Sequence, residues 1–258
     1  MKYLFVFSVV VLFISFKGQT QENALFKESL MKAWEQHTQK QYDSAMANYV
    51  KAFSNYNATE LENRILPEYK SVAKQLSGIF KKDQSIRTKY LKKSYPQGSK
   101  KRAALIEEMN TIDAENLKAV EGIIAEYGWL GPDQAGYFGN KAFFLILQHA
   151  ELDKQLRYFD HTVDAVAKGY MEPYQLAYLI DRISLREKRL LAFGSECRQY
   201  PNSQSYYVAP TFGISTLDER RAMIGLAPMA SYVTKYDIIW DPEAYTSNLP
   251  KLLEQLGF

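Results

Sequence analysis

Apolar side chains recur at helical spacing along most of this chain. They repeat every three or four residues, which is the pattern of an amphipathic helix with one buried face. The pattern predicts helices over about residues 24–57, 61–80, 103–127, 141–159, 163–169, 172–193 and 216–224, and a last short helix from Pro250. Residues 195–215 lack this period and are rich in Tyr, Ser, Pro and Gly, which predicts a short β-hairpin or extended flap. The expected fold class is therefore mainly α, a helical bundle with one small β element.

Residues 24–57 predict two helices that turn at Gln41-Tyr42-Asp43. The segment resembles a tetratricopeptide hairpin, whose second helix carries tyrosine just after the turn and then alanine, an aromatic residue and alanine. The sequence shows one such unit, and a single unit does not bury its own apolar face. The resemblance therefore implies either a hairpin packed on neighbouring helices or part of a peptide-binding array. His37 stands between polar neighbours and is expected on the surface.

The N-terminus has the organisation of a secretory signal peptide. Met1 and Lys2 precede an apolar run over residues 3–16, which is shorter than the roughly 20 residues of a membrane span. We therefore expect a signal peptide over 1–20 and an exported protein, periplasmic or secreted, without a membrane span after cleavage. A retained N-terminal anchor is the alternative. The remainder is expected to form a helical, tetratricopeptide-like region over 21–95 and a helical domain over 100–258.

The net charge and the single cysteine argue against several classes of partner and site. The net charge of +3 predicts no nucleic-acid partner. Basic residues gather between 81 and 102, offset only by Asp83. They form either a solvated face or mobile connector, or a docking surface for an anionic lipid, polysaccharide or nucleic acid, of which export disfavours the last. Cys197 is the only cysteine, which excludes an intramolecular disulfide. No histidine follows it to activate a thiolate, and we interpret it as a small, partly buried residue.

The most unusual combination of residues lies in the segment that begins with a glycine-rich turn around Trp129, where polar side chains stand on an otherwise apolar helix. Asn140 is a candidate N-cap for the helix that follows. The polar pair Gln148-His149 interrupts the apolar face of that helix. His149 and Asp153 are four residues apart and would share one helix face, where the carboxylate could orient the imidazole for general-base chemistry or both could bind a metal.

Two further pairs of polar residues lie on predicted helices. Asp113 and Asn116 are one turn apart, so their side chains share a face and could meet a partner from elsewhere in the fold. Asp181 and Arg182 are adjacent and diverge by about 100 degrees around a helix, so we expect each to have a different partner.

Six short motifs occur in order along the chain. They are Asp113-x-x-Asn116-Leu117, Gly128-Trp129-Leu130-Gly131, Gly136, Gln148-His149-Ala150 with Asp153 and Gln155, Ala177-Tyr178-Leu179-x-Asp181-Arg182, and Asp218-x-Arg220-Arg221-x-x-x-Gly225-Leu226. In this combination they resemble a bacterial domain-of-unknown-function family, DUF6624, over roughly residues 105–232. Two motifs depart from the family pattern. Leu130 stands where proline is usual, and Phe193-Gly194-Ser195-Glu196 stands where Tyr-Gly-Thr-Gln is usual, which puts a glutamate at the place of the glutamine. The resemblance implies a fold unit and leaves the function open.

The candidate site residues support two hypotheses. In the first they line a polar pocket, whose arginines would suit a carboxylate or phosphate. In the second they form a buried network of hydrogen bonds and ion pairs. The candidate catalytic residues are His149, Asp181 and Glu196. The candidate ligand-binding residues are Gln148, His149, Asp153, Asp181, Arg182, Arg220, Arg221 and Trp129.

We accordingly expect an exported helical binding or interaction protein, with a protein or a small anionic ligand as partner. The alternative is an exported hydrolase or lyase that acts on an anionic substrate through His149, Asp153, Asp181 and the arginines. The sequence has no glycine-rich phosphate loop, Gly-x-Ser-x-Gly or HExxH motif, and no second histidine at ligand spacing, so it assigns no cofactor and no metal site. His161 is expected at a helix cap or on the surface.

Overall fold

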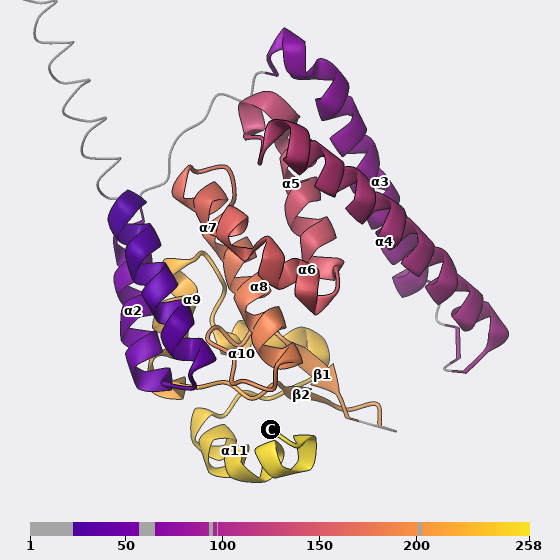
Figure 1. The fold of residues 1–258 in the computed structure, drawn as a ribbon. Coiled ribbons are helices and arrows are strands. Elements are labelled where there is room, and N and C mark those ends of the chain that lie inside the picture. Colours follow the sequence, from indigo (N-terminus) through magenta and orange to yellow (C-terminus); the bar gives the residue numbers. More distant parts are fainter. Residues whose placement is uncertain (1–22, 57–64, 93–94, 97, 201–202) are drawn as a thin grey trace, which may run out of the picture. The chain divides into compact units, whose positions relative to one another are not determined.

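A computed structural model describes residues 23–56, 65–92, 95–96, 98–200 and 203–258. These residues are mainly helical, and their sheet is a two-stranded antiparallel hairpin, which confirms the expected fold class (Figure 1). The chain divides into two compact units. Unit 1 comprises residues 1–59 and 172–258, and unit 2 comprises residues 60–171. The boundary expected at residues 96–99 lies inside unit 2, between two of its helices.

Unit 2 is built on three long helices. α3 (Lys70–Lys92) and α4 (Lys100–Tyr127) form a helical hairpin, and α5 (Pro132–His149) packs against both. The short η1 (Pro67–Tyr69) precedes α3, while α6 (Leu152–Arg157) and α7 (Phe159–Ala167) follow α5. Apolar side chains at helical spacing on the facing surfaces form the core, among them Val72, Leu76, Ile79, Val120, Ile123, Ala142, Phe143, Ile146 and Leu147.

The start of α5 differs from the prediction. The helix begins at Pro132 after Gly131, so Asn140 lies within it and is not its N-cap. Asn140 Nδ2 instead donates to the Leu130 carbonyl over 3.0 Å and braces the preceding turn. Gly136 has φ 67° and ψ 167° and kinks the helix, a conformation that essentially only glycine adopts.

Unit 1 combines the N-terminal helical hairpin with the last third of the chain. A helix over residues 23–38 and α2 (Tyr42–Ser54) form the hairpin. The later elements are α8 (Pro173–Arg186), β1 (Cys197–Gln199), β2 (Tyr206–Val208), η2 (Ile214–Thr216), α9 (Leu217–Met223), α10 (Met229–Tyr232), η3 (Val233–Tyr236) and α11 (Pro242–Leu256). β1 and β2 pair antiparallel with Cys197 opposite Val208, which is the hairpin expected in this region.

α11 begins earlier than predicted. Asp241 accepts hydrogen bonds from the backbone N–H groups of Glu243 and Ala244, and Pro242 occupies the first turn, where its missing N–H costs nothing. Pro250, the predicted start, lies inside the helix.

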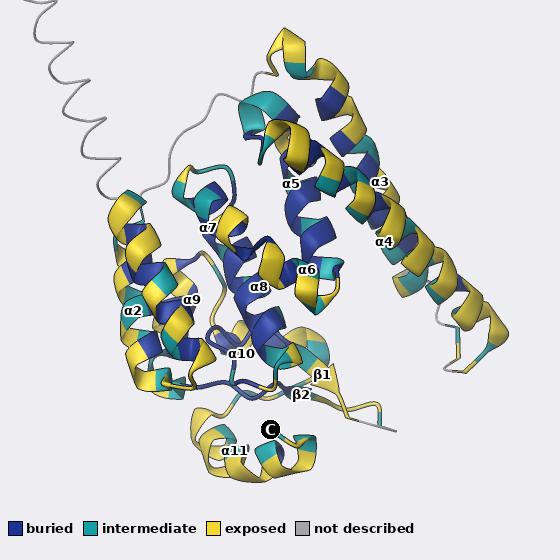
Figure 2. Ribbon diagram, viewed as in Figure 1, coloured by how far each residue is buried: buried dark blue, intermediate teal, exposed yellow. Residues whose placement is uncertain are grey.

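The N-terminal hairpin packs through aromatic side chains onto the segment that follows α8. Tyr49 and Phe53 meet Phe193 edge to face, with ring centroids 5.4 and 5.8 Å apart, and Tyr42 stacks on Phe212 at 5.0 Å. Figure 2 shows α8 buried along most of its length. The hairpin is therefore part of the core of unit 1. Its relation to tetratricopeptide repeats stays a prediction.

The predicted signal peptide, residues 1–20, lies outside the described residues. Within the described part of the chain, every helix is too short or too polar to cross a membrane.

Candidate functional site

His149 is the last residue of α5, because Ala150 has extended backbone angles and ends the helix. Asp153 lies on the separate helix α6 and is exposed. The prediction that His149 and Asp153 share one helix face is therefore wrong. The carboxylate that contacts His149 belongs to Asp83 on α3.

The His149 imidazole lies between a carboxylate and a guanidinium. Its Nδ1 is 3.1 Å from Asp83 Oδ1, and Arg87 Nε donates to its Nε2 over 3.2 Å. An ionised carboxylate only accepts hydrogen bonds and a guanidinium only donates them. The contacts thus fit a neutral ring that carries its proton on Nδ1.

Arg87 connects the imidazole to two carboxylates. Its Nη1 and Nη2 donate to the two oxygens of Asp113 on α4, each over 3.0 Å, and Nη1 lies 2.8 Å from Asp83 Oδ1. Asp113 thereby meets the partner from elsewhere in the fold that its sequence position predicts. The planar guanidinium suits such bidentate pairing. Asp83, Arg87, Asp113 and His149 form the His149 centre.

The centre carries one net negative charge when His149 is neutral, since two carboxylates meet one guanidinium. The Asp83 side chain is fully buried, whereas those of Asp113 and His149 are 25% and 21% exposed. Burial acts to raise the pKa of Asp83. The hydrogen bond from His149, the positive charge of that ring when it is protonated, the charge of Arg87 and the hydrogen bond from Gln84 outweigh burial, so the pKa of Asp83 is lowered.

A surface cavity of about 400 Å³ opens beside the centre. Its polar lining residues are Asn110, Asp113, His149 and Glu151, and its apolar ones are Ala114, Leu117, Ile146 and Ala150. Asp83, Asp113 and His149 also offer ligand atoms that lie within 4.8 Å of one another, close enough to hold a metal ion. Arg87 contacts all three of these residues and so competes for that position.

Two expected ligand-binding residues of unit 2 have other contacts. Gln148 is buried, and its backbone carbonyl accepts a hydrogen bond from Gln155 Nε2 over 2.9 Å. Trp129 packs on Phe143 with ring centroids 5.1 Å apart, at the edge of the core. Neither residue lines the cavity beside His149.

Asp181 organises a buried network in unit 1. Its carboxylate accepts hydrogen bonds from the backbone N–H groups of Ala192, Phe193 and Ser195 over 2.8, 3.1 and 2.8 Å. The side chain has no contact with solvent, and burial raises the pKa of Asp181 to about 6 although these hydrogen bonds favour ionisation. Asp181 thus fixes the path of the chain after α8.

Arg220 and Arg221 are almost fully buried and bind backbone carbonyl groups. Arg220 donates to the carbonyls of Ala192, Phe212 and Gly213 and to the Thr216 hydroxyl. Arg221 donates to the carbonyls of Phe193, Gly194 and Ala227. With Asp181 they form a hydrogen-bonded framework of the kind described by the second hypothesis, and it belongs to a different unit from His149.

Arg182 and Glu196 pair with each other in unit 1. Arg182 Nε donates to Glu196 Oε1 over 2.6 Å, and Arg198 lies 3.4 Å from the second carboxylate oxygen. Burial raises the pKa of the neighbouring Cys197 thiol to about 11, which disfavours the nucleophilic thiolate. Glu196 therefore acts here as an ion-pair partner, and Cys197 is a partly buried thiol.

His37 is fully buried, and its predicted surface position is wrong. Its Nε2 lies 2.6 Å from the Leu190 carbonyl oxygen and its Nδ1 lies 3.0 Å from the Tyr49 hydroxyl. Because a carbonyl only accepts, Nε2 carries the proton and donates. His161 is exposed, as expected.

Sequence reasoning missed Asp83 and Arg87 because they stand within the basic run between residues 81 and 102. The available signal was the four-residue spacing of one acid and one base on a predicted helix, which places the two side chains on one face.

The chain belongs to a family of unknown function (DUF6624), whose model matches residues 67–241. The match contains the whole His149 centre and the Asp181 framework and begins after the N-terminal hairpin. No curated protein and no solved structure matches the chain. The family assignment agrees with the resemblance carried by the motifs and brings no activity with it.

Proposed function

We propose that this is a ligand-binding protein whose His149 centre takes a small ligand through a positively charged group. The observation that carries the proposal is a charge imbalance. Two carboxylates share one guanidinium beside a cavity of about 400 Å³, and Glu151 adds a third carboxylate to its lining. A cation that enters the cavity is attracted by this uncompensated negative charge.

The ligand class that fits best is an organic amine. A metal ion held by Asp83, Asp113 and His149 would require Arg87 to leave and to give up both hydrogen bonds to Asp113. An ammonium group has three donors and can bind Asp113 and Glu151, the two carboxylates that line the cavity, while Arg87 stays. Binding an amine therefore preserves more of the existing contacts.

The anionic ligand considered from the sequence has less support. Arg220 and Arg221 are occupied by backbone carbonyls, and Arg182 is paired with Glu196. These guanidinium groups are already satisfied, and binding an anion would require breaking buried hydrogen bonds.

Native mass spectrometry of the purified protein tests the proposal. We expect a co-purifying amine, or binding of added putrescine, that is lost in Asp113→Asn and His149→Gln. His161→Gln is the matched control, because it removes an exposed histidine of the same unit and should bind like the wild type. Melting temperatures report whether each variant is folded. Binding of Zn²⁺ without binding of putrescine would show that the amine proposal is wrong. Binding of neither would show that the His149 centre is not a binding site for a cation.

The three histidines allow a second, independent test. Diethyl pyrocarbonate acylates accessible, neutral imidazoles, and peptide mass spectrometry reads each position separately. Exposed His161 should react fastest, buried His37 only after unfolding, and His149 at an intermediate rate. Saturating putrescine should slow the reaction of His149 alone. An unchanged His149 rate would contradict binding at this centre.

A second candidate function is proton transfer, favoured by the contact between buried Asp83 and His149 Nδ1. A carboxylate in that position orients the ring and stabilises an imidazolium, which forms when Nε2 accepts a proton after Arg87 Nε gives up its hydrogen bond to that nitrogen. In this case a bound ligand would be converted, and Asp83→Asn would slow its conversion more than its binding. A ligand recovered unchanged after long incubation argues for binding alone.

We further propose that the chain is exported, on the basis of its charged start and apolar N-terminal run. Expressed in a bacterial host, the protein should lose about its first 20 residues, as read by intact mass. An intact N-terminus on protein from the cytoplasmic fraction would contradict export.

A further inference from the structure

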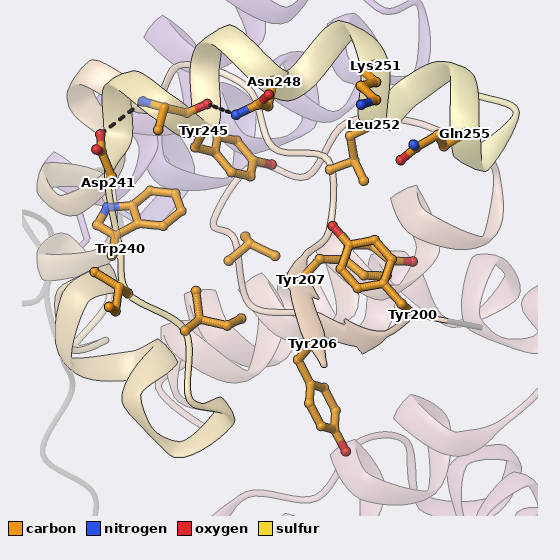
Figure 3. Close-up of a pocket in the computed structure, with 14 residues that line it drawn as sticks. Tyr200, Tyr206, Tyr207, Trp240, Asp241, Tyr245, Asn248, Lys251, Leu252 and Gln255 are labelled. Carbon is orange, nitrogen blue, oxygen red and sulfur yellow. Dashed lines mark hydrogen bonds between the residues drawn. The ribbon is translucent and has the colours of Figure 1, made fainter. Parts of the chain in front are cut away.

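Unit 1 carries a groove of about 510 Å³ between the β-hairpin and α11 (Figure 3). This volume falls within the roughly 300–1,000 Å³ that is usual for small-molecule sites. Five aromatic side chains from three segments line it, namely Tyr200, Tyr206, Tyr207, Trp240 and Tyr245. The groove is independent of the His149 centre, because none of its lining residues belongs to unit 2.

The aromatic rings are held in place by one another. Tyr200 lies against Tyr207 with ring centroids 4.6 Å apart, and Trp240 lies against Tyr245 at 5.1 Å. Tyr245 is fixed further, since its hydroxyl donates to the Ala209 carbonyl and accepts from the Thr211 N–H, each over 2.9 Å. Rings supported in this way lose little conformational freedom when a ligand stacks on them.

Polar side chains line the α11 wall of the groove, alongside Tyr245 and Leu252 of the same helix. Asn248, Lys251 and Gln255 recur at helical spacing along α11, and Figure 3 shows them in a row above the tyrosines. All three residues are exposed. Asn248 Nδ2 already donates one hydrogen bond to the Ala244 carbonyl over 2.8 Å. The row still offers further N–H donors and two amide oxygens that accept hydrogen bonds.

The charges in the groove nearly cancel. Lys251 and Asp241 are its charged lining residues, one of each sign. Asp241 also accepts two backbone hydrogen bonds, which hold its carboxylate at the start of α11. An ionic ligand gains little here, and a neutral one has no charge to desolvate.

We propose that this groove binds a neutral saccharide. The C–H face of a sugar ring is apolar and stacks on aromatic rings, while its hydroxyl groups both donate and accept hydrogen bonds. The groove supplies tyrosine rings from the β-hairpin on one wall, and on the α11 wall it supplies amide and ammonium groups beside Tyr245. Ile239 on the rim is 95% exposed and extends the apolar surface beside Trp240. A proline-rich peptide also docks in aromatic-lined grooves and is therefore the competing occupant in the test.

Isothermal titration of the full chain with cellohexaose, maltohexaose and chitohexaose tests the proposal, and decaproline is the competing probe. At least one hexasaccharide should bind. Tyr200→Ala and Gln255→Ala should each weaken it about tenfold, as expected for the loss of a stacking ring or of a hydrogen-bonding group. Tyr200→Phe keeps the ring and should bind more tightly than Tyr200→Ala. Gln39→Ala, an exposed glutamine of the same unit outside the groove, should bind like the wild type.

Three outcomes would overturn the proposal. They are no binding of any hexasaccharide at millimolar concentration, binding of decaproline alone, and hexasaccharide binding that neither Tyr200→Ala nor Gln255→Ala weakens. Gln255 is exposed on the last helix, so its replacement keeps the test valid if Tyr200→Ala reduces the melting temperature. Amine binding at the His149 centre should be unchanged in all four variants, which separates the two proposals.

Discussion

Burial shifts the pKa values of two side chains of unit 1 in opposite directions. Burial lowers the pKa of His37 to about 4 and raises the pKa of Asp181 to about 6, because it disfavours the charged form of each group. His37 is neutral at pH 7 and bonds to a carbonyl and a phenol. Asp181 depends on backbone N–H groups to keep its charge. The two residues therefore contribute opposite pH dependences to stability within one acidic window.

Replacing His37 with Gln should make stability rise on acidification between about pH 6.5 and 4, where the His37 and Asp181 contributions offset each other in the wild type. In this window the unfolded chain binds a proton at His37 that the folded chain does not, so acidification destabilises the fold by up to about 3 kcal/mol. Once the proton uptake of His37 in the unfolded chain is removed, the protonation of Asp181 in the folded chain dominates. The variant should therefore gain stability on acidification. Urea unfolding at several pH values measures this. His161→Gln should keep the wild-type profile, and a wild-type profile in His37→Gln would contradict the prediction.

Replacing Asp181 with Asn should have the reverse effect on the pH profile. The folded protein binds a proton at Asp181 between about pH 4 and 6 that the unfolded chain has released, so this group alone makes stability fall as the pH rises. Replacing Asp181 leaves the destabilising proton uptake of His37 in the unfolded chain unopposed. Asp181→Asn should therefore lose stability steeply on acidification through pH 6. The same urea series tests it. A profile as flat as that of the wild type would show that Asp181 has an ordinary pKa in the fold.

At the scale of single elements, α5 places the candidate site because its length and its end fix the position of His149. Its two halves join at the Gly136 kink, where a side chain would force an unfavourable backbone conformation and bring its Cβ 3.0 Å from Ile65 Cδ1. Gly122 on α4 is the opposite case, with helical backbone and open space where the Cβ of an alanine would lie. The two glycines make a matched pair within unit 2.

Gly136→Ala should destabilise the protein by about 1–3 kcal/mol, the range for a non-glycine residue held in such a conformation. Gly122→Ala should stabilise it by roughly 0.5–1 kcal/mol, since alanine restricts the unfolded chain and favours the helix. Differential scanning calorimetry of both variants tests the pair. Equal melting temperatures for the two would mean that α5 is not kinked at Gly136.

The existence of most helices could be predicted from the sequence, and their ends could not. The period of apolar residues predicts α4 and α8 because a buried face determines both the pattern and the packing. The first half of α5 is set off by the kink at Gly136, and the helix ends at His149 because Ala150 is extended. Neither feature changes the spacing of apolar residues along the sequence. Asp153 would share a face with His149 only if the helix continued past Ala150.

The candidate site was predicted in part. His149 and Asp113 are recognisable as polar residues on otherwise apolar helices, but their common partner Arg87 comes from a third helix more than twenty residues away in sequence. His37 shows the same limit, because its polar neighbours along the chain hide a side chain that bonds to Leu190. Spacing along one helix indicates shared faces, whereas contacts between helices need the packed structure.

At the scale of the whole molecule, unit 1 is discontinuous in sequence. Its first part supplies Tyr49, Phe53 and His37, and its second part supplies Phe193 and the Leu190 carbonyl that they contact. The region matched by the family model begins at Pro67, so the hairpin that buries Phe193 lies outside that region. The matched region therefore does not contain all of the core on which it depends.

A fragment of residues 172–258 should fail to fold by itself, because the apolar surface around Phe193 and the Leu190 carbonyl would be left exposed. Circular dichroism should show no cooperative melting. Adding residues 23–59 as a second chain, or restoring the full chain, should recover the transition. Cooperative melting of the isolated fragment would show that the hairpin is dispensable.

The insertion of unit 2 within unit 1 also imposes an order on biosynthesis. The hairpin leaves the ribosome first, and its partners around Phe193 are translated only after all of unit 2, a delay of roughly ten seconds at typical elongation rates. Throughout that interval the aromatic face of α2 is uncovered on a nascent polypeptide, so this short stretch is where a chaperone would be needed most.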